Sequence, residues 1–172
     1  KGAAVIQPLE EVPDRVAAHL LGDDTPDPAV EALAFATVAH DAAGTDALEG
    51  GLRAGARLAY VRERIGSAAV TVAARALARL GPPPVVVDLG RLSPGDDSRE
   101  IAAAAVRESR LRGTGLVAGP LDLLAERGPG AVRAWAEAPC PVVLHGSRGW
   151  DPAWSRAVPF LLDADLPAAQ ER

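Results

Sequence analysis

Residues 64–71 join an apolar run to an alanine-rich segment, and they hold the hydroxyl groups best placed to meet a ligand. Gly66 and Ser67 lie in this turn, and Thr71 follows four residues later. In parallel α/β sheets, ligands bind where a strand ends and a helix begins, because the first amides of the helix are free to contact them. Val70 offers neither charge nor a side-chain donor. We therefore expect Gly66, Ser67 and Thr71 to be the candidate ligand-binding residues of this turn, with no catalytic role.

His145, Ser147 and Asp151 lie close together and contain the three side-chain types of a hydrolase triad. The Gly-x-Ser-x-Gly elbow that exposes such a serine is missing from the sequence. His19 and His40 lie on predicted helices without acidic or histidine neighbours at metal-ligand spacing. We therefore expect no catalytic residue and no metal ligand in this chain.

Length and composition describe a folded chain with a mildly acidic surface. It has 172 residues, a formal net charge of -5, 48% hydrophobic and 24% charged residues. This charge disfavours binding to nucleic acid or to an anionic membrane, and no apolar run approaches the roughly 20 residues of a membrane span. The single cysteine, Cys140, excludes an internal disulfide and a cysteine-based zinc cluster. We expect a cytoplasmic protein, and the lack of methionine predicts that the segment comes from a longer chain.

Five apolar runs are typical of buried β-strands, and helical stretches separate most of them. The runs cover residues 58–61, 85–89, 116–118, 142–145 and 158–162. Strands that alternate with helices predict βαβ units and a parallel sheet. The helical stretches cover residues 67–80, 97–112, 121–126 and 131–137. We therefore expect a three-layer α/β domain.

Residues 1–55 are predicted to form a helical segment before this domain. A short helix should begin near Pro13, and a longer one should run from Ala29 and fade near Gly44. A segment this short cannot bury a core of its own. We therefore expect its apolar side chains, Val16, Leu20, Leu33 and Val38, to pack onto the α/β domain.

The order of the motifs resembles the core of an AAA+ ATPase with an eroded phosphate loop. A P-loop has two glycines, a lysine and a Ser or Thr at fixed spacing. Thr71 occupies the position of the hydroxyl that binds Mg²⁺, but Val70 replaces the lysine, and Ala69 and Arg64 replace the glycines. The run ending at residue 118 resembles the Walker B strand, with Gly119-Pro120 where an acidic pair is normal.

The resemblance continues toward the C-terminus. Residues 142–145 resemble the sensor-1 strand, with Gly146 or Ser147 near its polar position, and residues 156–172 resemble the stretch around the family's fifth strand. It implies a P-loop NTPase-like five-stranded sheet in the order 5-1-4-3-2 over residues 56–172, without the helical lid that normally follows. More narrowly, the chain resembles the first ATPase module of actinobacterial two-module AAA proteins, some of which are associated with contractile injection systems.

This resemblance implies a module that does not hydrolyse ATP and has an architectural or partner-docking role. Its expected partners are the rest of the same polypeptide, namely the lid and a second ATPase module, and other copies in a homo-oligomer. Two alternatives stay open. One is a nucleotide-binding ATPase domain with an atypical P-loop, which would bind ATP and Mg²⁺. The other is an unrelated parallel α/β binding domain.

Trp150, Trp154 and Arg156, which follow the fourth predicted strand, are candidates for an interface. Trp150 and Trp154 are two of three tryptophans, and Arg156 best matches a family arginine near the subunit boundary. Tryptophan and arginine dominate many protein interfaces. Packing within the loop is the alternative for the tryptophans, and a solvated side chain is the alternative for Arg156.

Overall fold

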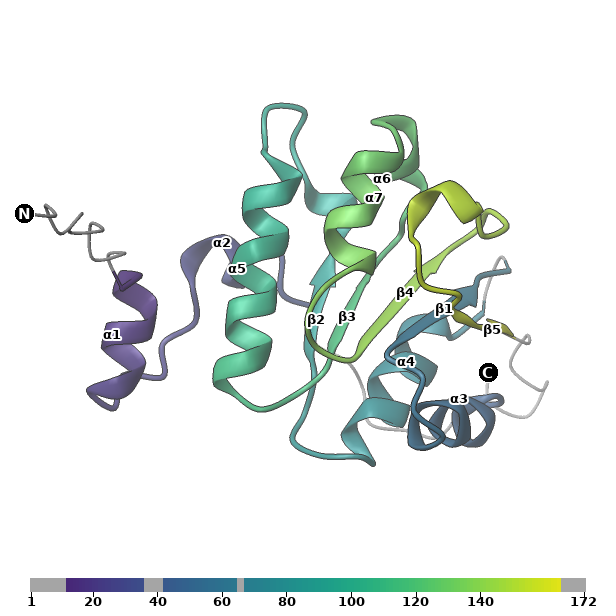
Figure 1. The fold of residues 1–172 in the computed structure, drawn as a ribbon, viewed down its shortest axis with the longest axis horizontal. Coiled ribbons are helices and arrows are strands. Elements are labelled where there is room, and N and C mark those ends of the chain that lie inside the picture. The colour runs from purple at the N-terminus through teal and green to yellow at the C-terminus, as the bar shows by residue number, and fades with distance from the viewer. Residues whose placement is uncertain (1–11, 36–41, 65–66, 165–172) are drawn as a thin grey trace, which may run out of the picture.

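A computed structural model describes residues 12–35, 42–64 and 67–164 (Figure 1). The five strands are β1 (Leu58–Arg62), β2 (Val85–Asp88), β3 (Leu116–Gly119), β4 (Val142–Gly146) and β5 (Phe160–Asp163). The α-helices are α1 (Asp14–Leu20), α2 (Pro28–Glu31), α3 (Thr45–Arg53), α4 (Ala69–Ala78), α5 (Ser98–Leu111), α6 (Asp122–Glu126) and α7 (Pro129–Ala136). Two short 3₁₀ helices are η1 (Leu89–Arg91) and η2 (Pro152–Trp154).

All strand pairs in the sheet are parallel, and the order is β2-β3-β4-β1-β5. This is the predicted order 5-1-4-3-2 read from the other edge, so the parallel α/β architecture and strand order are confirmed. The central strands have almost no polar side chains because helices cover both of their faces. Their registers pair Leu58 with Val142 and Val85 with Leu116.

The helices divide between the two faces of the sheet (Figure 1). On one face, α2, α5, α6 and α7 pack against a core that includes Trp135, Leu116 and Leu144. On the other face, α3 and α4 pack against a second core built around Val72 and Val143. The predicted strands and the helices of the α/β region agree with these elements to within about two residues at each end, the usual uncertainty of helix boundaries.

Side-chain caps fix the start of two helices. Asp27 Oδ1 accepts the amide of Ala29 at 3.0 Å and begins α2. Asp97 Oδ1 accepts the amide of Arg99 at 2.8 Å and begins α5. A carboxylate at this position satisfies an amide that has no partner within the helix. Gly113, with φ of 62°, follows the end of α5.

The prediction of one long helix from Ala29 is wrong, because α2 ends at Glu31. Ala34 instead forms an antiparallel bridge with Val87 on the outer edge of β2. Phe35 donates its amide to the Val86 carbonyl at 3.1 Å, in agreement with this bridge. Unpaired backbone groups at a sheet edge compete for this segment, and their hydrogen bonds override its helical periodicity. Val38 and His40 lie outside the described residues.

Helix α1 buries none of its residues, although it lies beside α5 (Figure 1). The predicted packing of Leu20 is wrong, since this side chain is 77% exposed, whereas Leu33 is buried as predicted and Val16 is half-buried. A buried ion pair holds α1 instead. Arg15 Nε donates to Glu108 Oε1 at 2.5 Å, and Glu108, on α5, is 0% exposed.

None of the helices in the described part of the chain combines the length and the apolar character needed to cross a bilayer.

Candidate functional site

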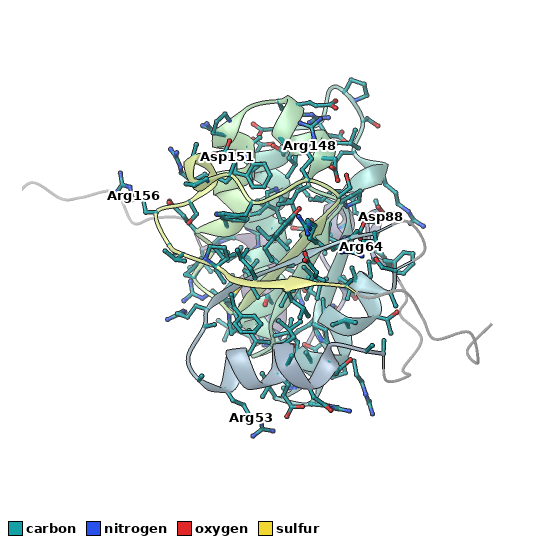
Figure 2. All side chains as sticks on the ribbon, turned by 90° about the vertical axis from the view of Figure 1, so that its right-hand side faces the viewer. Arg53, Arg64, Asp88, Arg148, Asp151 and Arg156 are labelled. Atoms are coloured by element: carbon teal, nitrogen blue, oxygen red, sulfur yellow. The ribbon has the colours of Figure 1, made fainter. Side chains whose placement is uncertain are left out.

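The carboxyl ends of the parallel strands meet at one edge of the sheet, where folds of this class bind ligands. Strand β4 lies between β3 and β1. His145, near the end of β4, therefore lies between the residues at the carboxyl ends of these two strands. Figure 2 shows the molecule with β5 toward the viewer. We describe this region as the carboxyl edge, defined by Glu63, Gly119, Asp122, His145 and Ser147.

His145 occupies the centre of the carboxyl edge and is buried. The residue is only 3% exposed. Its Nδ1 lies 2.5 Å from Oε1 of Glu63, the residue that follows β1. The other side of the imidazole ring covers Gly119, the last residue of β3. A Cβ atom at residue 119 would lie 2.5 Å from both Cδ2 and Nε2 of His145. The imidazole ring therefore fills the space that a side chain at residue 119 would need.

Asp122 and Ser147 form a second pair at the same edge. Ser147 Oγ donates to Asp122 Oδ1 at 2.6 Å, and the Ser147 amide donates to Asp122 Oδ2 at 3.0 Å. Arg148 Nε lies 3.8 Å from Oδ1. Burial acts to raise the pKa of Asp122, but the Ser147 hydrogen bonds and the Arg148 charge outweigh it and hold the pKa below its ordinary value. Both carboxylate oxygens are therefore engaged by the chain itself.

Three aromatic rings pack beside this edge. Tyr60, on β1, has ring centroids 5.4 Å from Trp150 and 6.3 Å from Trp154, and the two tryptophans are 5.3 Å apart. The Tyr60 hydroxyl donates to the Arg148 carbonyl at 2.6 Å. Burial, with smaller contributions from Asp122 and Glu63, raises the pKa of Tyr60, so the phenol stays a neutral donor.

A cavity of about 250 Å³ lies between these aromatics and β5, with Tyr60, Arg62, Trp150 and Asp163 in its lining. Arg62 and Asp163 close it with a two-point ion pair. The Nε–Oδ1 distance is 2.7 Å, and the Nη2–Oδ2 distance is 2.9 Å. Bidentate geometry of this kind orders both side chains. The charges that line this cavity are thus already paired with each other.

The predicted phosphate-binding turn lies at the same edge and is only partly described. Gly66 lies outside the described residues. Ser67 Oγ accepts the Arg64 amide at 3.2 Å, and the Ser67 amide donates to the Arg64 carbonyl at 2.8 Å. Thr71 is half-buried in the first turn of α4. No side-chain oxygen among the described residues caps that helix, so its first amides have no side-chain partner there.

The predicted interface residues have different environments. Trp154 is 5% exposed and belongs to the core beneath α7, which favours the loop-packing alternative for this residue. Trp150 is half-buried against the same core. Arg156 is exposed, and its amide donates to Glu137 Oε1 at 3.3 Å. Figure 2 shows Asp151 and Arg156 on the connection that leads from β4 to β5.

A hydrolase triad is not formed in the described part of the chain. His145 pairs with Glu63, Ser147 pairs with Asp122, and Asp151 Oδ1 accepts the amide of Ala153 at 2.9 Å. The three side chains therefore have separate partners. Among the described residues, the arrangement at this edge stabilises strand ends and turns, and His145 is not hydrogen-bonded to a serine hydroxyl.

Other polar residues have structural roles. Asp88 Oδ1 accepts the Gly90 amide at 2.9 Å and caps η1, which is the turn-forming role typical of an aspartate after a strand. His19 Nδ1 lies 2.8 Å from Asp24 Oδ1 on the surface. Cys140 is buried, and burial raises the pKa of its thiol despite the neighbouring Ser109 hydroxyl. Within the described ranges, no three His, Cys, Asp or Glu side chains gather as a metal site.

Sequence reasoning did not identify Glu63 and Tyr60 as parts of the site. Their partners are 82 and 88 residues away in the chain, so only the strand order brings them together. One local signal existed. Glycine ends β3 and a histidine stands near the end of β4, which suits a ring packed on a bare backbone between neighbouring strands.

No protein-family model matches this chain, and no curated protein matches it either.

Proposed function

We propose that this chain is a degenerate AAA+-like module that does not hydrolyse ATP and has an architectural or partner-docking role. The strand order supports the proposal, because it is the order that the resemblance implies. The groups that ATP hydrolysis needs are missing from the sequence at the corresponding positions. Val70 replaces the phosphate-binding lysine, and Gly119-Pro120 replaces the acidic pair.

The observation that carries the proposal is the packing of His145 over Gly119. An aspartate or glutamate at residue 119 would be needed to hold Mg²⁺ at the end of β3. The imidazole ring lies where the first carbon of such a side chain would be, because a Cβ atom at residue 119 would lie 2.5–2.6 Å from three ring atoms. The loss of the carboxylate is therefore compensated by neighbouring packing, as expected of a module whose sequence is no longer adapted to hydrolysis.

Asp122 does not replace the missing carboxylate. It stands three positions after Gly119, and Ser147 donates to both of its oxygens. Each of these hydrogen bonds to a charged acceptor is worth about 1.5–3 kcal/mol and orders the carboxylate. This arrangement supports a structural role for Asp122, which joins the start of α6 to the end of β4.

The docking role would use the connection between β4 and β5. Trp150 is half-buried at the cavity beside β5, and Arg156 and Val158 are exposed, with Val158 presenting most of its side chain to solvent. An exposed arginine beside apolar groups is a common composition of interface centres. Other parts of the same polypeptide, or a second copy of it, are the proposed partners.

A second candidate function is nucleotide binding by an atypical loop. The observation that favours it is the first turn of α4, which has no side-chain cap among the described residues and begins at the carboxyl edge next to Ser67. Free amides at the start of a helix attract anions. Without a lysine, these amides alone would give weak binding.

Calorimetry with Mg-ATP separates the two candidates. The proposed function predicts a dissociation constant no tighter than about 1 mM and no release of phosphate. The variant Val70→Lys should not restore hydrolysis, because residue 119 still lacks a carboxylate. A micromolar dissociation constant for the unchanged chain would favour nucleotide binding and overturn the proposal.

The docking role is tested by assembly of the longer protein that the resemblance implies. Trp150→Ala and Arg156→Ala should weaken assembly, while the melting temperature of the segment with Arg156→Ala should stay unchanged. Arg53→Ala, on the exposed surface of α3, is the matched control and should assemble normally. Unchanged assembly of both variants would remove this surface from the proposal.

A further inference from the structure

A groove of about 680 Å³ runs between α1, α5 and α7 on the face of the sheet opposite α3 and α4. Small residues form its floor. Ala102 and Ala103 come from α5, and Ala134 and Ala138 come from the region of α7. Val106 and Val16 add larger apolar surface. Because alanine side chains are short, the space between these helices is open and apolar.

Three arginines of α5 line the groove, in a protein of net charge -5. Arg99, Arg107 and Arg110 follow helical spacing, so they lie along one side of α5. Arg107 Nη2 pairs with Asp27 Oδ2 at 2.7 Å. Arg99 and Arg110 are exposed and have no ion-pair partner among the described residues. The charges of these two arginines are therefore available to an acidic ligand in the groove.

The groove lining has less negative charge than positive charge. Glu137 lines it from the end of α7. One of its oxygens accepts the Arg156 amide at 3.3 Å and lies 4.0 Å from Arg133 Nε. Glu137 is therefore directed in part toward the chain's own donors, and the groove as a whole presents positive charge.

The chain already shows that α5 accepts a helix on this side. Helix α1 lies beside α5 (Figure 1), and the Arg15–Glu108 pair holds it there. Val16 of α1 lines the groove, so the groove begins where the contact with α1 ends. A second helix lying along α5 would occupy the space between α1 and α7.

We propose that this groove binds an acidic amphipathic helix of a partner protein. The helix would place small apolar side chains on the alanine floor and carboxylates against Arg99 and Arg110. These arginines are eleven positions apart on α5, which is about 16 Å along a helix axis. A partner helix of about four turns would span both. Binding of an amphipathic helix in a groove between helices is a common recognition mode.

This inference goes beyond the docking role proposed above and does not rest on it, because the groove is a different surface from the connection between β4 and β5. The groove lies between helices and does not include the carboxyl edge, so nucleotide binding and groove binding can be measured separately. Failure of one leaves the other unaffected.

The test uses the 172-residue chain and a fluorescent 18-residue peptide with one alanine-leucine face and glutamates on the other. We expect saturable binding with a dissociation constant of roughly tens of micromolar, in the range of weak interfaces. Arg99→Glu with Arg110→Glu should weaken it about tenfold or more, and Arg99→Gln with Arg110→Gln should weaken it less. Arg53→Glu, on α3 (labelled in Figure 2), is the charge control and should leave binding unchanged.

Further variants and probes distinguish the groove from simple charge attraction. Ala103→Trp fills the groove without changing charge and should abolish peptide binding, with circular dichroism as the control for folding. A scrambled peptide of the same composition should bind at least tenfold more weakly. Equal binding of the scrambled peptide, or of a single-stranded oligonucleotide of equal charge, would overturn the proposal.

Three further outcomes are informative. Self-association in sedimentation experiments without peptide, lost in Ala103→Trp, would show that a second copy covers the groove and would overturn the proposal. Peptide binding together with micromolar affinity for Mg-ATP would support the groove and reject the proposed lack of nucleotide binding. Absence of both kinds of binding would reject the groove and leave the proposed lack of hydrolysis standing.

Discussion

Replacing Gly119 by alanine is the most direct test of the packing at the carboxyl edge. The added methyl group would lie 2.5 Å from Cδ2 and Nε2 of His145. Carbon atoms normally approach to about 3.5–4.0 Å, so the ring must move by roughly 1 Å. Overpacking of this kind costs about 1–3 kcal/mol. Movement of the ring also strains its contact with Glu63, and a hydrogen bond to a charged group contributes about 1.5–3 kcal/mol.

We therefore expect Gly119→Ala to lower the free energy of unfolding by about 3 kcal/mol, the sum of moderate values of both effects. For a domain of this size, each kcal/mol lowers the melting temperature by about 2–4 °C, so the expected shift is roughly 6–12 °C. Urea denaturation followed by circular dichroism measures the change. Gly50→Ala is the matched control, because a Cβ at Gly50 meets no atom within 4 Å. Since Gly50 lies within α3, this control should be neutral or stabilising by up to about 1 kcal/mol.

A double-mutant cycle with His145→Ala isolates the contact. Removing the ring opens the space for the methyl group. The double variant should therefore lose less free energy of unfolding than the sum of the losses in the two single variants. We expect a coupling energy of about 2 kcal/mol, well above the roughly 0.5 kcal/mol typical of independent sites. Additive effects, or a neutral Gly119→Ala, would refute the argument that the ring of His145 fills the space at residue 119.

Three further predictions concern Glu108, Asp122 and Cys140. Glu108→Gln leaves Arg15 without its carboxylate, so we expect a loss of about 3 kcal/mol in urea denaturation and faster amide exchange in α1. The pKa of Asp122 is lower in the folded chain than the ordinary value of 3.8, so its contribution is present above that value and is lost as pH falls through the folded pKa. Asp122→Asn should therefore remove part of the acid-induced loss of stability below about pH 4, as measured by thermal unfolding against pH, and Ser147→Ala should act in the same direction. Cys140 should react with iodoacetamide at least tenfold more slowly in the folded chain than in urea at pH 8, because its thiol is buried and its pKa is raised.

The strands were predictable because their sequences reflect burial on both faces. Val85–Val87 and Val142–Leu144 have no polar face, and such runs are typical of parallel sheets covered by helices. The strand order came from the resemblance and not from the runs themselves, since hydrophobic pattern alone does not rank one order above another. The caps at Asp27 and Asp97 were predictable because they depend only on neighbouring amides.

The N-terminal segment was harder to predict because single contacts fix it. Residues 32–35 have helical periodicity, but the edge of β2 offers them hydrogen bonds that a helix would not use. The Phe35 amide donates to the Val86 carbonyl, and the Asp88 amide donates to the Leu33 carbonyl. Leu20 has the spacing of a buried residue and is exposed, because α1 is held through Arg15 and Glu108 rather than through its apolar side chains. These two residues are 93 positions apart, and no local pattern links them.

Two sets of contacts order the carboxyl edge at the ends of β3 and β4. Glycine at residue 119 makes room for the His145 ring, and the buried ring in turn pairs with Glu63. Asp122 lies beyond Gly119 and fixes Ser147, the residue that follows β4. A carboxylate introduced at residue 119 would disturb the first of these contacts before it could bind a metal ion. If the function proposed above is right, ATP hydrolysis would require coordinated changes at residues 70, 119 and 145, and no single substitution would be sufficient.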